Sequence, residues 1–79
     1  MRFVLYSRPG CGLCEELLAA LAAVRAAQRY PIEVVDVDAE EATRIRYGHK
    51  IPVLLFDGEL VCHGHLDVDE VHKALAYRR

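Results

Sequence analysis

The sequence predicts an α/β fold in the order β-α-β-α-β-β-α, with a four-stranded mixed sheet and helices on both of its faces. In the first half of the chain, apolar runs typical of strands alternate with segments of helical spacing. Further on, the turn signal Asp57-Gly58 separates the strand-like runs 52–56 and 59–63, as in a two-residue hairpin. Strands joined through a helix pair in parallel, whereas a hairpin adds an antiparallel strand, so the sheet is expected to be mixed.

The first half of the chain predicts strand, helix and strand. Residues 2–7 contain a continuous apolar run that stops at a Pro-Gly turn, which is typical of a strand buried on both faces. Residues 12–28 predict a helix that ends before Tyr30-Pro31, and residues 32–37 predict the second strand. The helix is predicted by apolar side chains at helical spacing, namely Cys14, Leu17, Leu18, Leu21 and Val24.

Two capping-box patterns predict the remaining helices. Asp38, followed three residues later by Glu41, is expected to open a short helix that Gly48 closes. Asp67 and Glu70 repeat the pattern at the start of the last helix.

Length, charge and cysteine count narrow the classes of protein. A chain of 79 residues is expected to hold one domain, residues 1–79, which buries about 60% of the surface that its unfolded chain exposes. The net charge of -2, without a basic stripe, argues against a nucleic-acid partner, and Arg78 and Arg79 are expected to form a solvated tail. Three cysteines are too few, and odd in number, for a disulfide-stapled secreted scaffold, so cysteine chemistry is expected.

The chain is expected to be cytoplasmic and to have no membrane partner. The apolar run at residues 3–6 is shorter than that of a signal peptide. The longest apolar run, residues 17–24, is far shorter than a bilayer crossing requires.

Two cysteines, Cys11 and Cys14, stand where the first strand meets the first helix. Unpaired N–H groups at a helix N-terminus stabilise an anion, so they lower the pKa of a thiol placed there and make it a better nucleophile. Cys14 is in phase with Leu17 and Leu21 and is expected to point inward, within disulfide distance of Cys11. Cys11 is therefore predicted to attack and Cys14 to resolve. Three side chains are candidates to supply positive charge near the thiolate, namely Arg8, His49 and Lys50.

The sequence resembles glutaredoxins, members of the thioredoxin-fold superfamily, over nearly its whole length. Residues 5–14, Leu-Tyr-Ser-Arg-Pro-Gly-Cys-Gly-Leu-Cys, look like the active-site strand and loop of that family, with Arg8 where a lysine is common. Ile51-Pro52 falls where the family has its cis-proline loop. The resemblance implies a thioredoxin-like fold, a cis bond before Pro52 and a groove in which Ile51 presents its backbone to a bound thiol peptide.

The resemblance leaves the partner open between a disulfide-bearing protein and glutathione. Cys-Gly-Leu-Cys stands where dithiol glutaredoxins have Cys-Pro-Tyr-Cys, and only Gly64 and Asp67 match the segment that holds the γ-glutamyl end of glutathione. We expect a thiol-disulfide oxidoreductase without a bound cofactor, for which glutathione is a candidate co-substrate and a thioredoxin-type reductase a candidate donor. Its predicted substrate-binding residues are Arg8, Lys50, Ile51, Pro52 and Gly64.

Two other functions stay open on the sequence. Cys11, Cys14, Cys62 and His65 would form a Cys₃His zinc set if the fold brought the hairpin to the dithiol. Cys62 also fits a half-buried strand position, where a small apolar thiol is common. A non-catalytic thioredoxin-fold adaptor would show an ordinary thiol pKa at Cys11 and no turnover.

Overall fold

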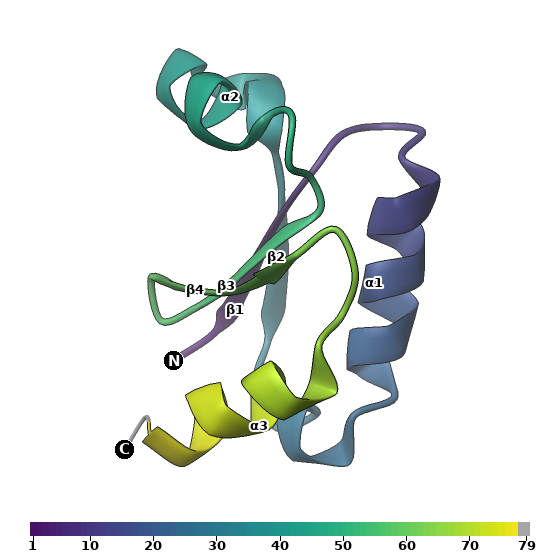
Figure 1. Ribbon diagram of the computed structural model, residues 1–79, viewed down its shortest axis with the longest axis vertical. Helices are drawn as coiled ribbons and strands as arrows, with labels where there is room; N and C mark the ends of the chain where they lie inside the picture. Colours follow the sequence, from purple (N-terminus) through teal and green to yellow (C-terminus); the bar gives the residue numbers. More distant parts are fainter. Residues whose placement is uncertain (78–79) are drawn as a thin grey trace.

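The computed structural model describes residues 1–77 and has the predicted order β-α-β-α-β-β-α, with two short 3₁₀ helices added (Figure 1). The strands are β1 (Phe3–Ser7), β2 (Ile32–Asp36), β3 (Val53–Phe56) and β4 (Glu59–His63). The α-helices are α1 (Gly12–Ala22), α2 (Glu41–Tyr47) and α3 (Val68–Tyr77), and the 3₁₀ helices are η1 (Arg25–Ala27) and η2 (Val37–Ala39). Arg78 and Arg79, the expected solvated tail, lie outside the described residues.

The four strands form one mixed sheet in the order β2-β1-β3-β4, which confirms the predicted sheet. β1 and β2 are parallel across the α1 crossover, and β3 is antiparallel to both β1 and β4. Asp57 and Gly58 have φ angles of 52° and 85°, and a type I′ turn needs positive φ at both positions. The hairpin therefore forms at the predicted residues.

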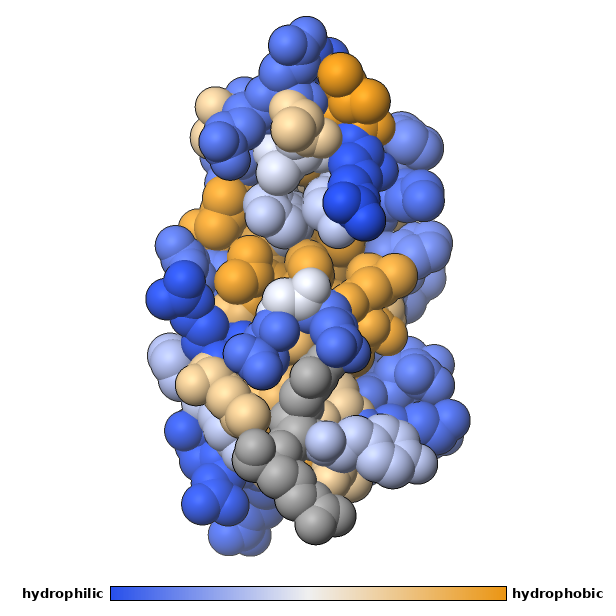
Figure 2. Space-filling model, turned by 90° about the vertical axis from the view of Figure 1, so that its left-hand side faces the viewer, coloured by the Kyte–Doolittle hydropathy of each residue, from blue (hydrophilic) through white to orange (hydrophobic). Residues whose placement is uncertain are grey.

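The helices lie on both sides of the sheet. α1 and α3 cover one face, and the core lies between them and the strands. On the other face Tyr47 of α2 stacks on Tyr6 of β1, with ring centroids 5.2 Å apart. Figure 2 shows apolar side chains reaching the surface on the rest of this face; by strand register the apolar residues here include Val4, Val35 and Leu60. The buried core residues are Phe3, Leu5, Leu17, Leu21, Ala27, Leu54, Phe56, Val61 and Val71.

Helix α1 ends at Ala22 rather than at the predicted Gln28. Val24 is extended, with φ −80° and ψ 110°, and the chain then turns through η1, which buries Ala27 in the core. The side-chain Nε2 of Gln28 donates to the Ala22 carbonyl at 3.0 Å and satisfies an acceptor that the helix end leaves free. The apolar spacing continues past Ala22 because these side chains pack on the same core without continuing the helix.

The predicted capping box at Asp38 and Glu41 is wrong. The predicted second strand ends at Asp36, and η2 intervenes before α2, whose N-cap is Glu40 and receives no side-chain hydrogen bond. The carboxylate of Asp38 binds Arg8 of the loop after β1 instead. A partner thirty positions away in the sequence has displaced the local cap.

The other predicted helix ends are found. Gly48 follows the last residue of α2 and donates its N–H to the Arg44 carbonyl at 2.9 Å. Asp67 Oδ1 accepts the N–H of Glu70 at 3.1 Å and caps α3, while the Glu70 carboxylate contacts Lys73 Nζ at 3.3 Å. Within residues 1–77 no helix is long and apolar enough to cross a membrane.

Leu21→Ala tests the packing of α1 on the sheet. Leu21 is 0% exposed, so its truncation is expected to lower the free energy of unfolding by about 2–5 kcal/mol in urea titrations followed by circular dichroism. Leu60→Ala is the matched control. The same truncation at a side chain that is 58% exposed is expected to change the free energy of unfolding by about 0.5 kcal/mol or less. Equal losses in the two variants would contradict this packing.

Candidate active site

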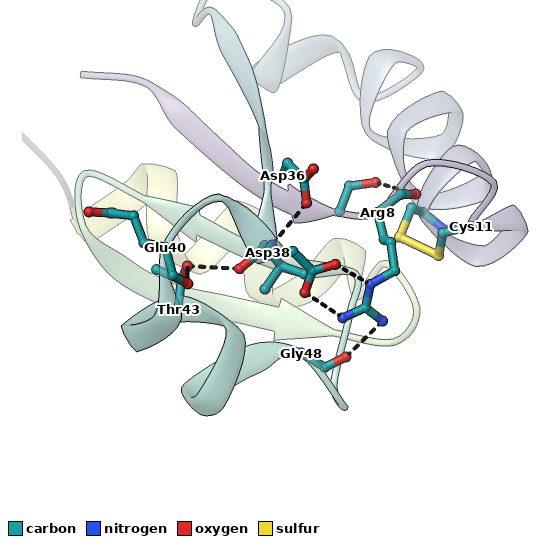
Figure 3. A network of polar contacts seen from close by, with 10 residues as sticks. Arg8, Cys11, Asp36, Asp38, Glu40, Thr43 and Gly48 are labelled. Atoms are coloured by element: carbon teal, nitrogen blue, oxygen red, sulfur yellow. Dashed lines mark hydrogen bonds and ion pairs between the residues drawn. A yellow bond between two sulfur atoms is a disulfide. The ribbon is translucent and has the colours of Figure 1, made fainter.

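The two cysteines of the Cys-Gly-Leu-Cys segment lie at the N-terminus of α1 and are joined by a disulfide (Figure 3). Their Cα atoms are 5.2 Å apart, inside the usual range for a disulfide. Cys11 is the N-cap residue of α1, and Cys14 lies in the first turn. As the helix phase predicts, Cys14 is buried, at 2% exposed, whereas Cys11 is half-exposed.

The start of α1 places one backbone N–H group against the Cys11 sulfur and another against its carbonyl. The N–H of Cys14 donates to Cys11 Sγ at 3.2 Å, and the N–H of Glu15 donates to the Cys11 carbonyl at 3.2 Å. A sulfur at this position accepts the hydrogen bond that an Asp or Ser side chain accepts at other helix starts. When the disulfide is reduced, this hydrogen bond and the helix dipole stabilise a negative charge on Cys11 Sγ.

A tight turn connects β1 to α1 and sets where the helix begins. The N–H of Cys11 donates to the Arg8 carbonyl at 3.1 Å, which closes the turn across Pro9 and Gly10. Gly10 has φ +80°, a conformation that residues with a side chain rarely adopt. The Pro-Gly pair therefore reverses the chain directly after β1, so that Cys11 becomes the helix cap.

Arg8 ties this loop to two other segments of the chain (Figure 3). Its Nε donates to Asp38 Oδ2 at 2.7 Å and its Nη2 to Asp38 Oδ1 at 2.9 Å, a bidentate pair. Its Nη1 donates to the Gly48 carbonyl at 3.4 Å. The hydrogen bond from Arg8 lowers the pKa of the Asp38 carboxyl, and the same bond raises the pKa of Arg8. The positive charge of Arg8 is thus already paired within the protein.

The loop before β3 lies beside this turn. Tyr6 pairs with Val53 in neighbouring antiparallel strands, so the chain that leaves β1 and the chain that enters β3 meet at one end of the sheet. The Ile51–Pro52 peptide bond is cis, as the family resemblance implies, and Pro52 is buried. In residues 1–77 the backbone of Ile51 makes no hydrogen bond, and Lys50 is exposed.

Gly64 lies against the same loop. Its N–H donates to the Pro52 carbonyl at 2.8 Å, which fixes the segment after β4 beside the cis-proline. Gly64 and His65 also line a pocket of about 230 Å³ together with Leu13, the residue that precedes Cys14. The predicted residues Ile51, Pro52 and Gly64 therefore gather near one end of α1.

The predicted zinc set is not assembled. Across residues 1–77 no three His, Cys, Asp or Glu side chains lie close enough together to hold a metal ion. Cys11 and Cys14 are bonded to each other, while Cys62 and His65 line a separate hollow at the start of α3. Cys62 is the half-buried strand residue of the alternative interpretation, and its burial raises the pKa of its thiol.

Sequence reasoning missed two residues of this site, Asp38 and Gly48. Asp38 carried a local signal for a helix cap, which obscured its pairing with Arg8. Gly48 accepts the Arg8 hydrogen bond through its backbone carbonyl, which every residue has, so its residue type carries no signal for this contact. The sequence does place an arginine, Arg8, directly before the Pro-Gly turn. A charged side chain at such a position can be expected to pair with a carboxylate, but the sequence does not say which one.

A disulfide-bonded cysteine pair at the start of the first helix, on a mixed sheet of order β2-β1-β3-β4, defines a thioredoxin-fold protein. The Glutaredoxin-like domain (DUF836) family matches residues 2–76 of the chain. The chain belongs to this glutaredoxin-like family.

Similar proteins agree with this assignment. The uncharacterized protein Rv0508 of Mycobacterium tuberculosis strain H37Rv is 31% identical over 71 residues, which cover 84% of this chain and 71% of that protein. The solution structure of protein Ne2328 from Nitrosomonas europaea is 33% identical, has a TM-score of 0.77 and covers 92% of this chain and 88% of its own. Oxidized glutaredoxin 2 from Chlamydomonas reinhardtii shares the fold, with a TM-score of 0.54 at 19% identity over 95% of this chain and 71% of its own.

Arg8→Met tests the ion pair with Asp38. Loss of the guanidinium is expected to raise the pKa of Asp38 toward its ordinary value, measured by NMR titration of the side-chain carboxyl. A carboxyl whose pKa is lowered by folding stabilises the fold above its unfolded pKa, and this contribution disappears as the pH falls through the lowered pKa. The wild type should therefore lose more stability on acidification than Arg8→Met.

Arg2→Met is the control for this experiment. It removes an exposed arginine that contacts Glu33 at 3.4 Å on another part of the sheet, so the pKa of Asp38 should stay as in the wild type. An unchanged Asp38 pKa in Arg8→Met would show that the pair does not hold in solution.

Proposed function

We propose that the protein is a thiol-disulfide oxidoreductase in which Cys11 attacks and Cys14 resolves. The observation that carries the proposal is the contrast in burial within the pair: Cys11 is partly exposed and its sulfur accepts a helix N–H, whereas Cys14 is 2% exposed. The burial of Cys14 supports Cys11 as the sulfur that meets a large substrate and Cys14 as the one that resolves.

The reaction runs in two exchange steps. In the reduced protein the Cys11 thiolate attacks one sulfur of a substrate disulfide, forms a mixed disulfide and releases the other substrate sulfur as a thiolate. Cys14 then loses its proton and attacks Cys11 Sγ, which breaks the mixed disulfide and releases the second substrate thiol. Two electrons have passed to the substrate, and the protein is left with the Cys11–Cys14 disulfide seen here.

The cis-proline loop is the proposed place for the substrate backbone. The backbone of Ile51 has no hydrogen bond within residues 1–77, so it can pair with an extended segment that carries the attacked sulfur. The hydrogen bond from the Gly64 N–H to the Pro52 carbonyl holds the segment after β4 beside this loop, and Lys50 is exposed. Arg8 acts on this groove indirectly, since it binds the carbonyl of Gly48 at the start of the loop.

The partners follow from this chemistry. We propose a disulfide-bearing protein or glutathione as the substrate, and glutathione or a thioredoxin-type reductase as the source of electrons. A reducing compartment such as the cytoplasm keeps such a pair in the dithiol form that attacks.

Cysteine substitutions test the proposed roles. Cys11→Ser is expected to reduce the rate of insulin disulfide reduction with dithiothreitol to the uncatalysed rate, because the attacking sulfur is gone. Cys14→Ser is expected to accumulate a mixed disulfide at Cys11, visible by mass spectrometry as an adduct that dithiothreitol removes. Cys62→Ser is the matched control and should keep the wild-type rate. Wild-type activity in Cys11→Ser would refute the proposal.

A further inference from the structure

A second pocket borders the disulfide on the flank of α1 that faces β2. It has a volume of about 310 Å³, and both Cys11 and Cys14 belong to its wall. The pocket that contains Gly64 lies on the other flank of α1, toward the segment after β4. Of these two pockets, only the one on the β2 side has the two cysteines in its wall.

The strand register explains why this pocket is open. Leu5 pairs with Val34, and both side chains lie on the face of the sheet that α1 covers. β2 is the edge strand, and Val34 is not covered by the helix, so it remains 52% exposed. Leu18 of α1 completes an apolar lining that fits an aliphatic side chain.

The rim of the pocket carries negative charge. Glu15 and Asp36 line it, and within residues 1–77 neither carboxylate has an ion-pair partner within 4 Å. Asp36 Oδ1 accepts the N–H of Asp38 at 2.9 Å, and Asp38 and, after it, Asp36 raise the pKa of Arg8. Arg8 also lines the pocket, but its guanidinium is held by both oxygens of Asp38. The rim therefore favours a cation over an anion.

We propose that this β2-side pocket is a specificity site for a protein substrate and that it binds an aliphatic residue adjoining a lysine or arginine, close to the attacked cysteine. The proposal rests on the exchange reaction proposed above. An apolar floor beside two carboxylates matches this pair of side chains, and Cys11 in the wall keeps the occupant near the sulfur to be attacked. Glutathione has two carboxylates, one ammonium group and no apolar side chain, so the pocket favours a protein segment with an aliphatic and a basic side chain over glutathione.

Peptide disulfides test the proposed specificity. The probes are two cysteine peptides, one with Leu-Lys and one with Ser-Asp beside the cysteine, each joined to thionitrobenzoate. Cys11 attacks the peptide sulfur, thionitrobenzoate leaves as a coloured thiolate, and Cys14 then releases the peptide thiol. With pre-reduced wild type, the second-order rate constant for release of thionitrobenzoate in a single turnover is expected to be roughly tenfold higher for the Leu-Lys peptide, the lower end of what one methylene in an apolar pocket contributes.

Substitutions in the pocket should remove this preference. Val34→Asn replaces the apolar floor with a neutral polar side chain and is expected to lower the ratio of the two rates. The double substitution Glu15→Gln with Asp36→Asn keeps the side-chain shapes and is expected to lower the ratio and weaken its dependence on salt. Glu33→Gln, on the opposite face of β2, is the matched control and should keep the wild-type ratio.

A binding measurement separates this proposal from the proposed activity. The Leu-Lys peptide with serine in place of cysteine, added to the oxidised protein, should shift the NMR signals of Val34 and Leu18. No shift, or equal rates with both peptides in the wild type, would overturn the specificity site while the exchange reaction stands. If Cys11→Ser protein reduced the peptides at the wild-type rate, the exchange mechanism would fail, whereas shifts at Val34 would still support the pocket.

Discussion

The position at which α1 begins determines which of the two cysteines is buried and which is open to solvent. β1 ends at Ser7, and a turn through Gly10 at φ +80° delivers Cys11 to the N-cap position. Cys14 lies one helical turn later, on the side of α1 that faces the core. Moving the helix start by one residue would rotate both sulfur atoms, because each residue advances the helix by about 100°. The difference in exposure between the two cysteines thus depends on a strand-to-helix turn of a few residues.

The ion pair of Arg8 and Asp38 controls the charge around this centre. A free arginine before the cysteine pair would attract anions, but Asp38 binds it through two hydrogen bonds. Both side chains are partly exposed, so the pair adds little to the free energy of unfolding. Its main effects are on the position of the loop after β1 and on the electrostatic potential near the disulfide. It joins the loop after β1 to the end of α2, and the carboxylates of Glu15 and Asp36 lie on one side of the disulfide without a salt bridge to Arg8.

Local patterns predicted much of the fold and part of the site. Asp57-Gly58 fixed the hairpin, and the helix phase placed Cys14 inward, because each depends only on neighbouring residues. The end of α1 and the partner of Asp38 could not be predicted in this way. Val24 continues the apolar spacing whether the backbone is helical or extended, and a carboxylate at a helix-cap position can equally bind a distant cation. Both outcomes depend on tertiary contacts that no short pattern contains.

The half-buried position of Cys62 affects which disulfide isomers the oxidised protein can form. A chain with three cysteines could in principle form more than one disulfide isomer. Burial raises the pKa of the Cys62 thiol, so it stays protonated and is a poor nucleophile toward the Cys11–Cys14 disulfide. In the exchange proposed above, Cys62 is therefore expected to attack the Cys11–Cys14 disulfide more slowly than an exposed thiol would.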